Sequence, residues 1–239
     1  LTVVDPAVCS TGLLIGNSRW HWAEPLADRW RFDHSPPDFS RLAMSPPVWA
    51  AVGPVPETPF LKEVRRLTLA DVPLKGCPPW LGVDRALGAF SALSRCVEQQ
   101  LDYRAGVLLA DAGTVLSLTL LDPAGGFRGG QLIPGLRMQL QAMAEGAAGL
   151  ELPTLDVESH GLFPRETDAA MWRGSLQALV GALGEAQRLS GALLWLCGGD
   201  AARLEPELIR AGLQVRCDPD LVMKGLVDLM PNFSPDPDR

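Results

Sequence analysis

Residues 111–136 read DAGTVLSLTLLDPAGGFRGGQLIPGL, and this stretch decides how the chain is interpreted. A carboxylate, Asp111, leads into Gly113-Thr114 and an apolar run, which ends in the turn 122–126. Apolar residues on both sides of this corner predict two strands joined by a tight hairpin. Such a corner suits a phosphate through its N–H groups and hydroxyl, and a cation through its carboxylate. The residues alone leave a second interpretation open, in which Asp111 only caps a turn.

The composition excludes several classes of protein. The 239 residues are 47% hydrophobic and 21% charged, with a net charge of −7, which suits one large globular domain or two modest ones. The negative charge argues against a general nucleic-acid or anionic-membrane binder. We find no leader segment and no apolar run that would span a bilayer, so we expect a cytoplasmic protein. The scattered cysteines and histidines favour neither a disulfide framework nor a zinc site.

The beginning of the chain repeats the pattern of residues 111–114. Residues 13–18, LLIGNS, again form an apolar segment, a glycine corner and a hydroxyl. Residues 19–23 predict a returning strand and residues 28–33 a third. Two halves with a similar strand–turn–strand start indicate an internal duplication. We therefore expect two domains, residues 1–103 and 104–239.

Residues 84–99 predict an amphipathic helix, because apolar side chains recur at helical spacing on one face. Asp84 stands at its start, directly after a loop rich in proline and glycine. Two roles fit this position. An Asp at a helix start is a common N-cap, and the same carboxylate is placed to accept a proton from a substrate hydroxyl during phosphoryl transfer.

The second half alternates strands and helices. The predicted helices are 134–144, 167–189 (continuous or broken near Gly181), 201–211 and one from residue 220. Residues 193–197 predict a buried strand that ends in Gly198-Gly199-Asp200. A strand, a glycine pair and a helix place a helix N-terminus where a nucleotide can lie against bare backbone. An ordinary strand-to-helix turn fits the same residues.

Taken together, these short motifs resemble type III pantothenate kinase, in order and spacing, along roughly residues 13–226. The matching pieces are GVDR (82–85), DAGT (111–114), GGQLIPGL (129–136), ETDA (166–169), GGD (198–200) and PDLV (219–222). The resemblance implies an α/β fold of two RNase-H-like, actin-like ATPase domains, each a mixed sheet with flanking helices. It places the chain in the acetate and sugar kinase/Hsc70/actin superfamily.

The resemblance also implies an activity and its cofactors. The reaction is transfer of the γ-phosphoryl group of ATP to pantothenate, which gives 4'-phosphopantothenate in the first step of coenzyme A biosynthesis. The implied cofactors are Mg²⁺ and a monovalent cation, K⁺ or NH₄⁺. The implied assembly is a homodimer, with no nucleic-acid or membrane partner.

Site residues follow from the matched motifs. Asp84 resembles the general base, and Asp111 the ligand of the monovalent cation. The residues implied to bind pantothenate are Gly82, Val83, Asp84, Arg85 and Thr167. The residues implied to bind ATP are Thr114 and the first phosphate loop, Leu14, Ile15, Gly16, Asn17, Ser18, Arg19, Trp20 and His21.

The chain departs from the family pattern at several positions. The first loop usually reads Asp-x-Gly-Asn-Thr, whereas Leu14 and Ser18 stand here, and His21 replaces a common Lys. Lys75 stands where an aromatic residue is usual, and whether Trp80 substitutes for it stays open. We expect activity with an altered metal dependence or affinity. A non-catalytic regulatory or accessory protein and a related small-molecule kinase are the alternatives.

Overall fold

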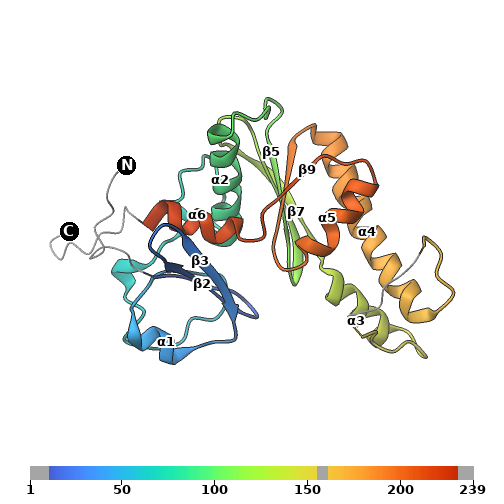
Figure 1. Cartoon of the computed structure of the whole chain (residues 1–239), viewed down its shortest axis with the longest axis horizontal. Helices are drawn as coiled ribbons and strands as arrows, with labels where there is room; N and C mark the ends of the chain where they lie inside the picture. Colours follow the sequence, from blue (N-terminus) through green and yellow to red (C-terminus); the bar gives the residue numbers. More distant parts are fainter. Residues whose placement is uncertain (1–10, 155–160, 231–239) are drawn as a thin grey trace. The chain divides into compact units, whose positions relative to one another are not determined.

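The computed structural model describes residues 11–154 and 161–230, which form two compact units (Figure 1). The first unit combines the described residues up to Arg95 with those from Asp220 onward, and the second runs from Cys96 to Pro219. The helix α6 (Leu221–Leu229) therefore belongs to the first unit. The division expected from the sequence had assigned residues 104–239 to one domain.

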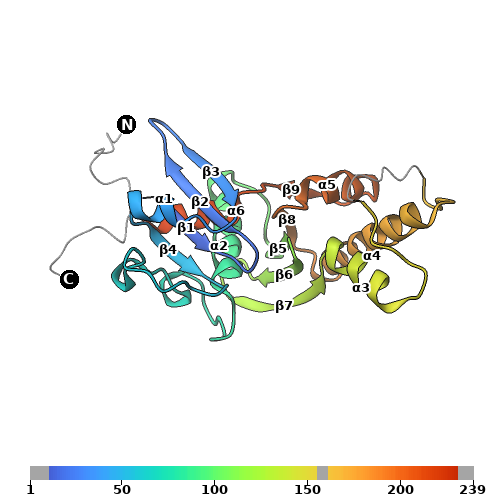
Figure 2. The same cartoon turned by 90° about the horizontal axis from the view of Figure 1, so that it is seen from below.

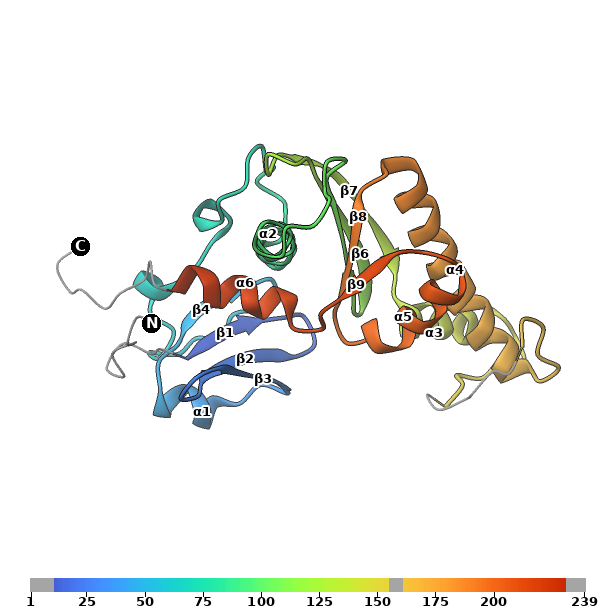
Figure 3. The same ribbon diagram turned by 45° about the horizontal axis from the view of Figure 1, so that its top comes forward.

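The first unit is built on a four-stranded mixed sheet with the order β3-β2-β1-β4. Its strands are β1 (Gly12–Ile15), β2 (Trp20–Pro25), β3 (Trp30–Ser35) and β4 (Val48–Ala51). The first three form an antiparallel meander, and β4 pairs with β1 in parallel. Its helices are α1 (Phe39–Met44), α2 (Val83–Glu98) and α6, and α6 contacts β1 and β2 (Figure 3).

The second unit repeats this order in a five-stranded sheet, β7-β6-β5-β8-β9 (Figure 2). Its strands are β5 (Val107–Ala112), β6 (Val115–Leu121), β7 (Phe127–Pro134), β8 (Leu193–Cys197) and β9 (Val215–Cys217). Here too a three-stranded antiparallel meander is followed by a strand, β8, that pairs in parallel with the first strand, β5. The shared topology agrees with the predicted duplication.

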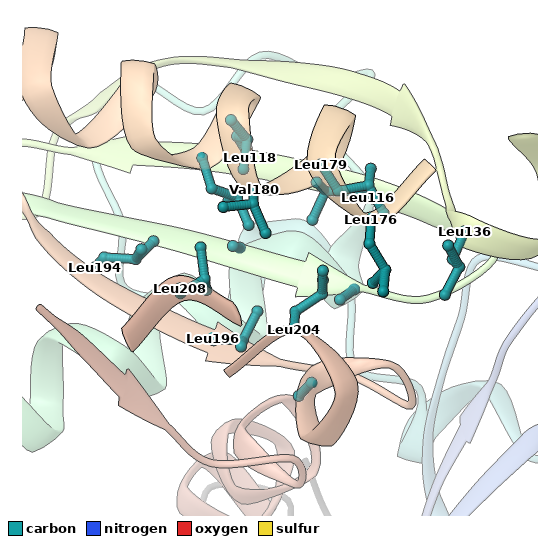
Figure 4. Close-up of a cluster of buried hydrophobic side chains, with 14 of the residues drawn as sticks. Leu116, Leu118, Leu136, Leu176, Leu179, Val180, Leu194, Leu196, Leu204 and Leu208 are labelled. Carbon is teal, nitrogen blue, oxygen red and sulfur yellow. The ribbon is translucent and has the colours of Figure 1, made fainter. Parts of the chain in front are cut away.

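Three helices complete the second unit: α3 (Leu136–Gly146), α4 (Thr167–Ser190) and α5 (Ala201–Arg210). Leucines of β6, β8, α4 and α5 interdigitate between the sheet and the helices (Figure 4). The alternation of apolar residues in the strands and their three-to-four spacing in the helices create this layer. The core therefore fixes the strand ends from which the loops of this unit project.

Most elements agree with the sequence prediction, and the differences have local causes. The helix α4 is continuous through Gly181 and ends where Gly191 adopts a left-handed conformation. The sequence also suggested a short strand at residues 66–70, which is wrong: this segment makes only an isolated bridge, Trp49–Arg66, and a 3-10 turn, Leu69–Asp71. Pro134 ends β7 and does not start a helix. Part of the irregular segment 151–163 and the tail lie outside the described residues.

The packing of α6 against α2 generates a stability prediction. A Cβ added at Gly225 would lie 2.3 Å from the carbonyl oxygen of Leu87, so Gly225→Ala forces the two helices apart. We expect a loss of about 1–3 kcal/mol in the free energy of unfolding, as in other overpacked contacts. The control is Gly181→Ala in α4, where nothing lies within 4 Å; it should add about 0.5–1 kcal/mol. Urea unfolding of both variants checks this, and equal stabilities would show that the α2–α6 contact is not tight.

Candidate active site

The first loop, Gly16–Arg19, joins β1 to β2 and is held by backbone hydrogen bonds. The carbonyl oxygen of Ile15 accepts the N–H groups of Val52 and Gly53, at 2.9 and 3.1 Å, and the Gly16 N–H donates to Arg19 O at 3.0 Å. A Cβ at Gly53 would lie 2.2 Å from the carbonyl oxygen of Gly16, so only glycine permits this approach. The end of β4 and the first loop therefore form one rigid corner.

The GVDR motif lies beside the same corner. A Cβ at Gly82 would come within 3.5 Å of the Val52 side chain and 2.4 Å of the Asp84 carboxylate. Asp84 is the second residue of α2, and its Oδ1 accepts the N–H of Arg85 at 2.7 Å. Burial raises the pKa of Asp84 above its ordinary value, and the Arg85 N–H and charge oppose this only in part. A half-buried carboxylate with a raised pKa is a stronger base than an exposed one.

A hollow of about 290 Å³ adjoins this motif. It is lined by the end of β4, by segment 66–69 and by Leu81, Gly82 and Val83. Arg66 stacks on the Trp49 ring at 4.9 Å and pairs with Glu63 at 2.9 Å, so its guanidinium is held at this side of the unit. The hollow has the position of a small-molecule pocket, next to a carboxylate with a perturbed pKa. Neither Arg66 nor Gly53 was identified from the sequence as part of a site: Arg66 begins a segment that suggested a strand, and Gly53 lies in a proline-rich stretch.

The second unit gathers the DAGT and GGD motifs at the carboxyl ends of β5 and β8. Asp111 and Cys197 are direct neighbours in this parallel pair. The Asp200 N–H donates to Ala112 O at 2.9 Å, and the Gly135 N–H donates to Thr114 O at 3.1 Å. In open α/β sheets, ligands bind outside the carboxyl ends of parallel strands. Asp111, Thr114 and the GGD motif therefore lie at the same edge of the sheet of this unit.

Gly198 allows the backbone after β8 to come close to the end of β5. Its φ of +90° is a conformation that L-residues rarely adopt, and its Cβ would lie 2.5 Å from Oδ1 of Asp111 and 2.6 Å from Ala112 O. Burial, and next the neighbouring Asp111 carboxylate, raise the pKa of the Cys197 thiol well above its usual value. Cys197 therefore stays a neutral thiol and does not act as a nucleophile or a metal-binding thiolate. Asp111 Oδ1 and Ala112 O both lie beside Gly198, and carboxylate and carbonyl oxygens are the ligands that a hard cation prefers.

Leu14 and His21, which both differ from the family pattern, lie opposite each other in the sheet. Leu14 pairs with His21 across β1 and β2, and it is only 4% exposed. Both side chains lie on the face that α6 contacts, while Leu13 and Ile15 pack into the core on the other face. Leu14 therefore puts an apolar side chain where the family pattern has a carboxylate. Asn17, Ser18 and Arg19 are exposed in the loop.

Thr167, the remaining predicted pantothenate residue, is the first residue of α4 and is exposed. It belongs to the second unit, whereas Gly82–Arg85 belong to the first. Among residues 11–154 and 161–230, no group of three or more His, Cys, Asp or Glu side chains is arranged to hold a metal. A Mg²⁺ ion would take most of its ligands from phosphate and water, as this ion commonly does. No helix in these ranges is long and apolar enough to cross a membrane.

The environment of Asp84 predicts an unusual effect on stability. Its raised pKa means that the folded protein carries a buried charge at neutral pH at a cost. This cost is absent when the pH is below the pKa of Asp84 in the unfolded protein. It grows as the pH rises from that value to the pKa of Asp84 in the folded protein. We expect Asp84→Asn to have a higher melting temperature than the parent protein at pH 7, and the difference to shrink on acidification.

The matched control for this measurement is Asp102→Asn. The Arg104 guanidinium lowers the pKa of Asp102 to about 2, but both side chains are exposed to solvent, so removing this carboxylate should change the melting temperature little. Thermal melts between about pH 4 and pH 8 compare the variants across the range in which the Asp84 charge appears. A lower melting temperature for Asp84→Asn at every pH would contradict the assignment of a costly buried charge.

Comparison with known proteins identifies the family. The profile of "Type III pantothenate kinase" matches residues 72–188. A type III pantothenate kinase of Synechococcus sp. (strain JA-3-3Ab) is 34% identical over 230 residues, which cover 89% of this chain and 88% of the relative.

Two solved structures share the fold at low sequence identity. One, from Campylobacter jejuni, is described as a candidate Baf family transcriptional activator (TM-score 0.61, 16% identity, 93% of this chain and 98% of that one). The other is the activator of 2-hydroxyisocaproyl-CoA dehydratase from Clostridium difficile with bound ADPNP (TM-score 0.54, 11% identity, 94% and 95%). They support the predicted actin-like fold class. From its sequence relatives, this chain belongs to the type III pantothenate kinase family.

Proposed function

We propose that this chain phosphorylates pantothenate with ATP, as its family does, with Asp84 as the general base. The observation that carries the role of Asp84 is its half-buried carboxylate, fixed by the Arg85 N–H at 2.7 Å beside a hollow of about 290 Å³. A general base works best when its pKa lies near the working pH, and burial moves the pKa of Asp84 in that direction. The carboxylate accepts the proton of the pantothenate hydroxyl as the oxygen attacks the γ-phosphorus.

Pantothenate occupies the hollow in this proposal. Gly82 and Val83 line it, and Asp84 directly follows Val83 in the chain. Arg85, directly after Asp84, supplies positive charge close to the reacting groups. Thr167, which belongs to the second unit, is also proposed to bind pantothenate.

The residues proposed to bind ATP come from two glycine corners, one in each unit. The first loop, Gly16–Arg19, and Thr114 contact the phosphates, since backbone N–H groups and hydroxyls stabilise phosphate oxygens without reorganising. Mg²⁺ neutralises phosphate charge, which is the main task of catalysis in phosphoryl transfer. A monovalent cation, K⁺ or NH₄⁺, binds at the Asp111 carboxylate, whose Oδ1 lies beside Gly198. The homodimer and the cytoplasmic location stay predictions.

A regulatory protein without catalysis is the second candidate function, and Leu14 is the observation that favours it. A buried leucine stands at the end of β1, just before the first loop, where the family pattern has a carboxylate. The loss of that carboxylate weakens the binding of a metal–phosphate complex. Asp84 and Asp111, each at the end of a precisely held corner, favour catalysis instead. A third candidate, a kinase of another small alcohol, uses the same groups and differs only in the substrate that fits the hollow.

The role of Asp84 predicts a large kinetic effect. Asp84→Asn should lower kcat for pantothenate by about 10²–10⁴-fold, the usual effect of losing a general base, with a smaller change in KM. The parent enzyme should lose kcat/KM on the acidic side as Asp84 is protonated, with a midpoint above the ordinary Asp pKa of about 3.9. A coupled assay of ADP release measures both, and Asp102→Asn serves as the control. Full activity of Asp84→Asn would remove this residue from the role.

The cation site at Asp111 predicts selective activation. We expect the parent enzyme to turn over faster in K⁺ or NH₄⁺ than in Na⁺ at equal ionic strength. Asp111→Asn should abolish this difference, because the amide leaves the cation without its charged ligand. Rates are compared in buffers of the three chlorides. Equal rates of the parent enzyme in K⁺ and Na⁺ would contradict the assignment.

A further inference from the structure

Two histidines and a carboxylate form a hydrogen-bonded chain in the first unit. His21 of β2 and His34 of β3 are direct partners across the sheet, and their Nδ1 atoms are 2.8 Å apart. The other nitrogen of His34, Nε2, lies 3.2 Å from Oδ1 of Asp220, the residue that precedes α6. The chain therefore connects two neighbouring strands to the start of α6, which runs beside them in Figure 3.

The other end of this hydrogen-bonded chain is close to the first loop, Gly16–Arg19. A Cβ built on Gly16 would lie 3.1 Å from Nε2 of His21, so this nitrogen is next to the loop backbone. The residue opposite His21 on β1 is Leu14, which offers no carboxylate to compete for an N–H at Nε2. Whether Nε2 carries a proton therefore decides whether the loop gains a hydrogen-bond donor.

The proton positions in the chain are coupled. A short Nδ1–Nδ1 contact needs one proton between the two nitrogens, and the Asp220 carboxylate accepts the Nε2–H of His34. When His34 is neutral, its Nδ1 is bare and accepts from Nδ1–H of His21, which leaves Nε2 of His21 bare at the loop. When the pair gains one proton, the Nδ1 proton passes to His34 and the new proton resides on Nε2 of His21. One proton thus changes His21 from an acceptor to a donor.

The surroundings place the added charge on His34 rather than on His21. Burial, and then the neighbouring His34 and Arg19, lower the pKa of His21 to about 4, while Asp220 opposes this. His34 contacts Asp220 directly, and Asp33 of the same strand adds negative charge nearby. The side chains of His34 and Asp220 are 36% and 32% exposed, so the pair exchanges protons with solvent.

We propose that Nε2–H of His21 donates to a phosphate oxygen of ATP at the first loop, and that His34 and Asp220 are positioning residues that place this proton. This inference rests on the proposed binding of ATP at that loop. It makes nucleotide affinity rise as the pH falls through the range in which histidines titrate, roughly pH 5 to 8. The kinetic consequence falls on KM for ATP, whereas protonation of Asp84 acts on kcat.

The proton chain is tested first without nucleotide. Histidine ¹⁵N NMR of the full chain, labelled at the imidazoles, reports which nitrogen of His21 carries the proton at each pH. We expect His21 to change from the Nδ1–H to the Nε2–H form as the hydrogen-bonded pair gains one proton. Asp220→Asn should move this change to lower pH, because the charge on His34 loses its partner. The control, Asp228→Asn, changes a carboxylate of α6 that pairs with Arg95 instead and should leave the tautomer change in place.

The phosphate contact is tested by calorimetric binding of Mg²⁺-ADPNP. One hydrogen bond corresponds to about a 3–10-fold change in Kd, so Asp220→Asn should bind that much more weakly than Asp228→Asn near pH 6 and equally near pH 8. Protonation of the nucleotide itself affects both variants equally, so the comparison with Asp228→Asn removes this effect. A His21 that keeps one tautomer at every pH overturns the relay. A tautomer change with identical affinities overturns the phosphate contact. No binding by the parent protein overturns the proposed function, while the NMR result still decides the relay.

Discussion

In both units, a carbonyl oxygen at the end of the first strand accepts a backbone N–H from the segment after the parallel strand. Ile15 O accepts from Val52 and Gly53, and Ala112 O accepts from Asp200. Buried backbone groups must be paired, so this bond fixes the loop as firmly as the sheet itself. The corners that carry the proposed chemistry are therefore extensions of the sheets. Gly53 and Gly198 keep the space beside them free of a Cβ.

The repeating parts of this structure could be predicted from the sequence. Local apolar periodicity predicted α2, α4, β5, β6 and β8, and the glycine corners indicated where strands end. Burial of the Asp84 carboxylate could not be predicted, because it depends on Val52 and Gly82 meeting in space. The contact between His34 and Asp220 joins residues 186 positions apart. No local pattern encodes such a pair. The position of α6 in the first unit could not be predicted for the same reason, because it depends on packing against Leu87, which is distant in the sequence.

Leu14 belongs to a row of side chains that crosses the sheet of the first unit, and this row explains the substitution. Ala50, Leu14, His21 and His34 are successive partners across β4, β1, β2 and β3. Replacing a carboxylate by leucine removes a negative charge from this row, and a neutral histidine then suits the opposite position better than a lysine. The two departures from the family pattern therefore belong together. Both lie beside the loop that we propose to bind phosphate, while Asp84 and Asp111 are retained.

The central claim is that a family member with Leu14 in its phosphate loop still transfers phosphate to pantothenate. The most direct measurement is incubation of the purified chain with pantothenate, ATP, Mg²⁺ and K⁺, followed by mass spectrometry of the products. The account predicts 4'-phosphopantothenate and ADP in equal amounts, and no ADP when pantothenate is omitted. Folded protein that binds neither substrate, or that releases no ADP with Mg²⁺ or Mn²⁺, would contradict it and favour the regulatory function.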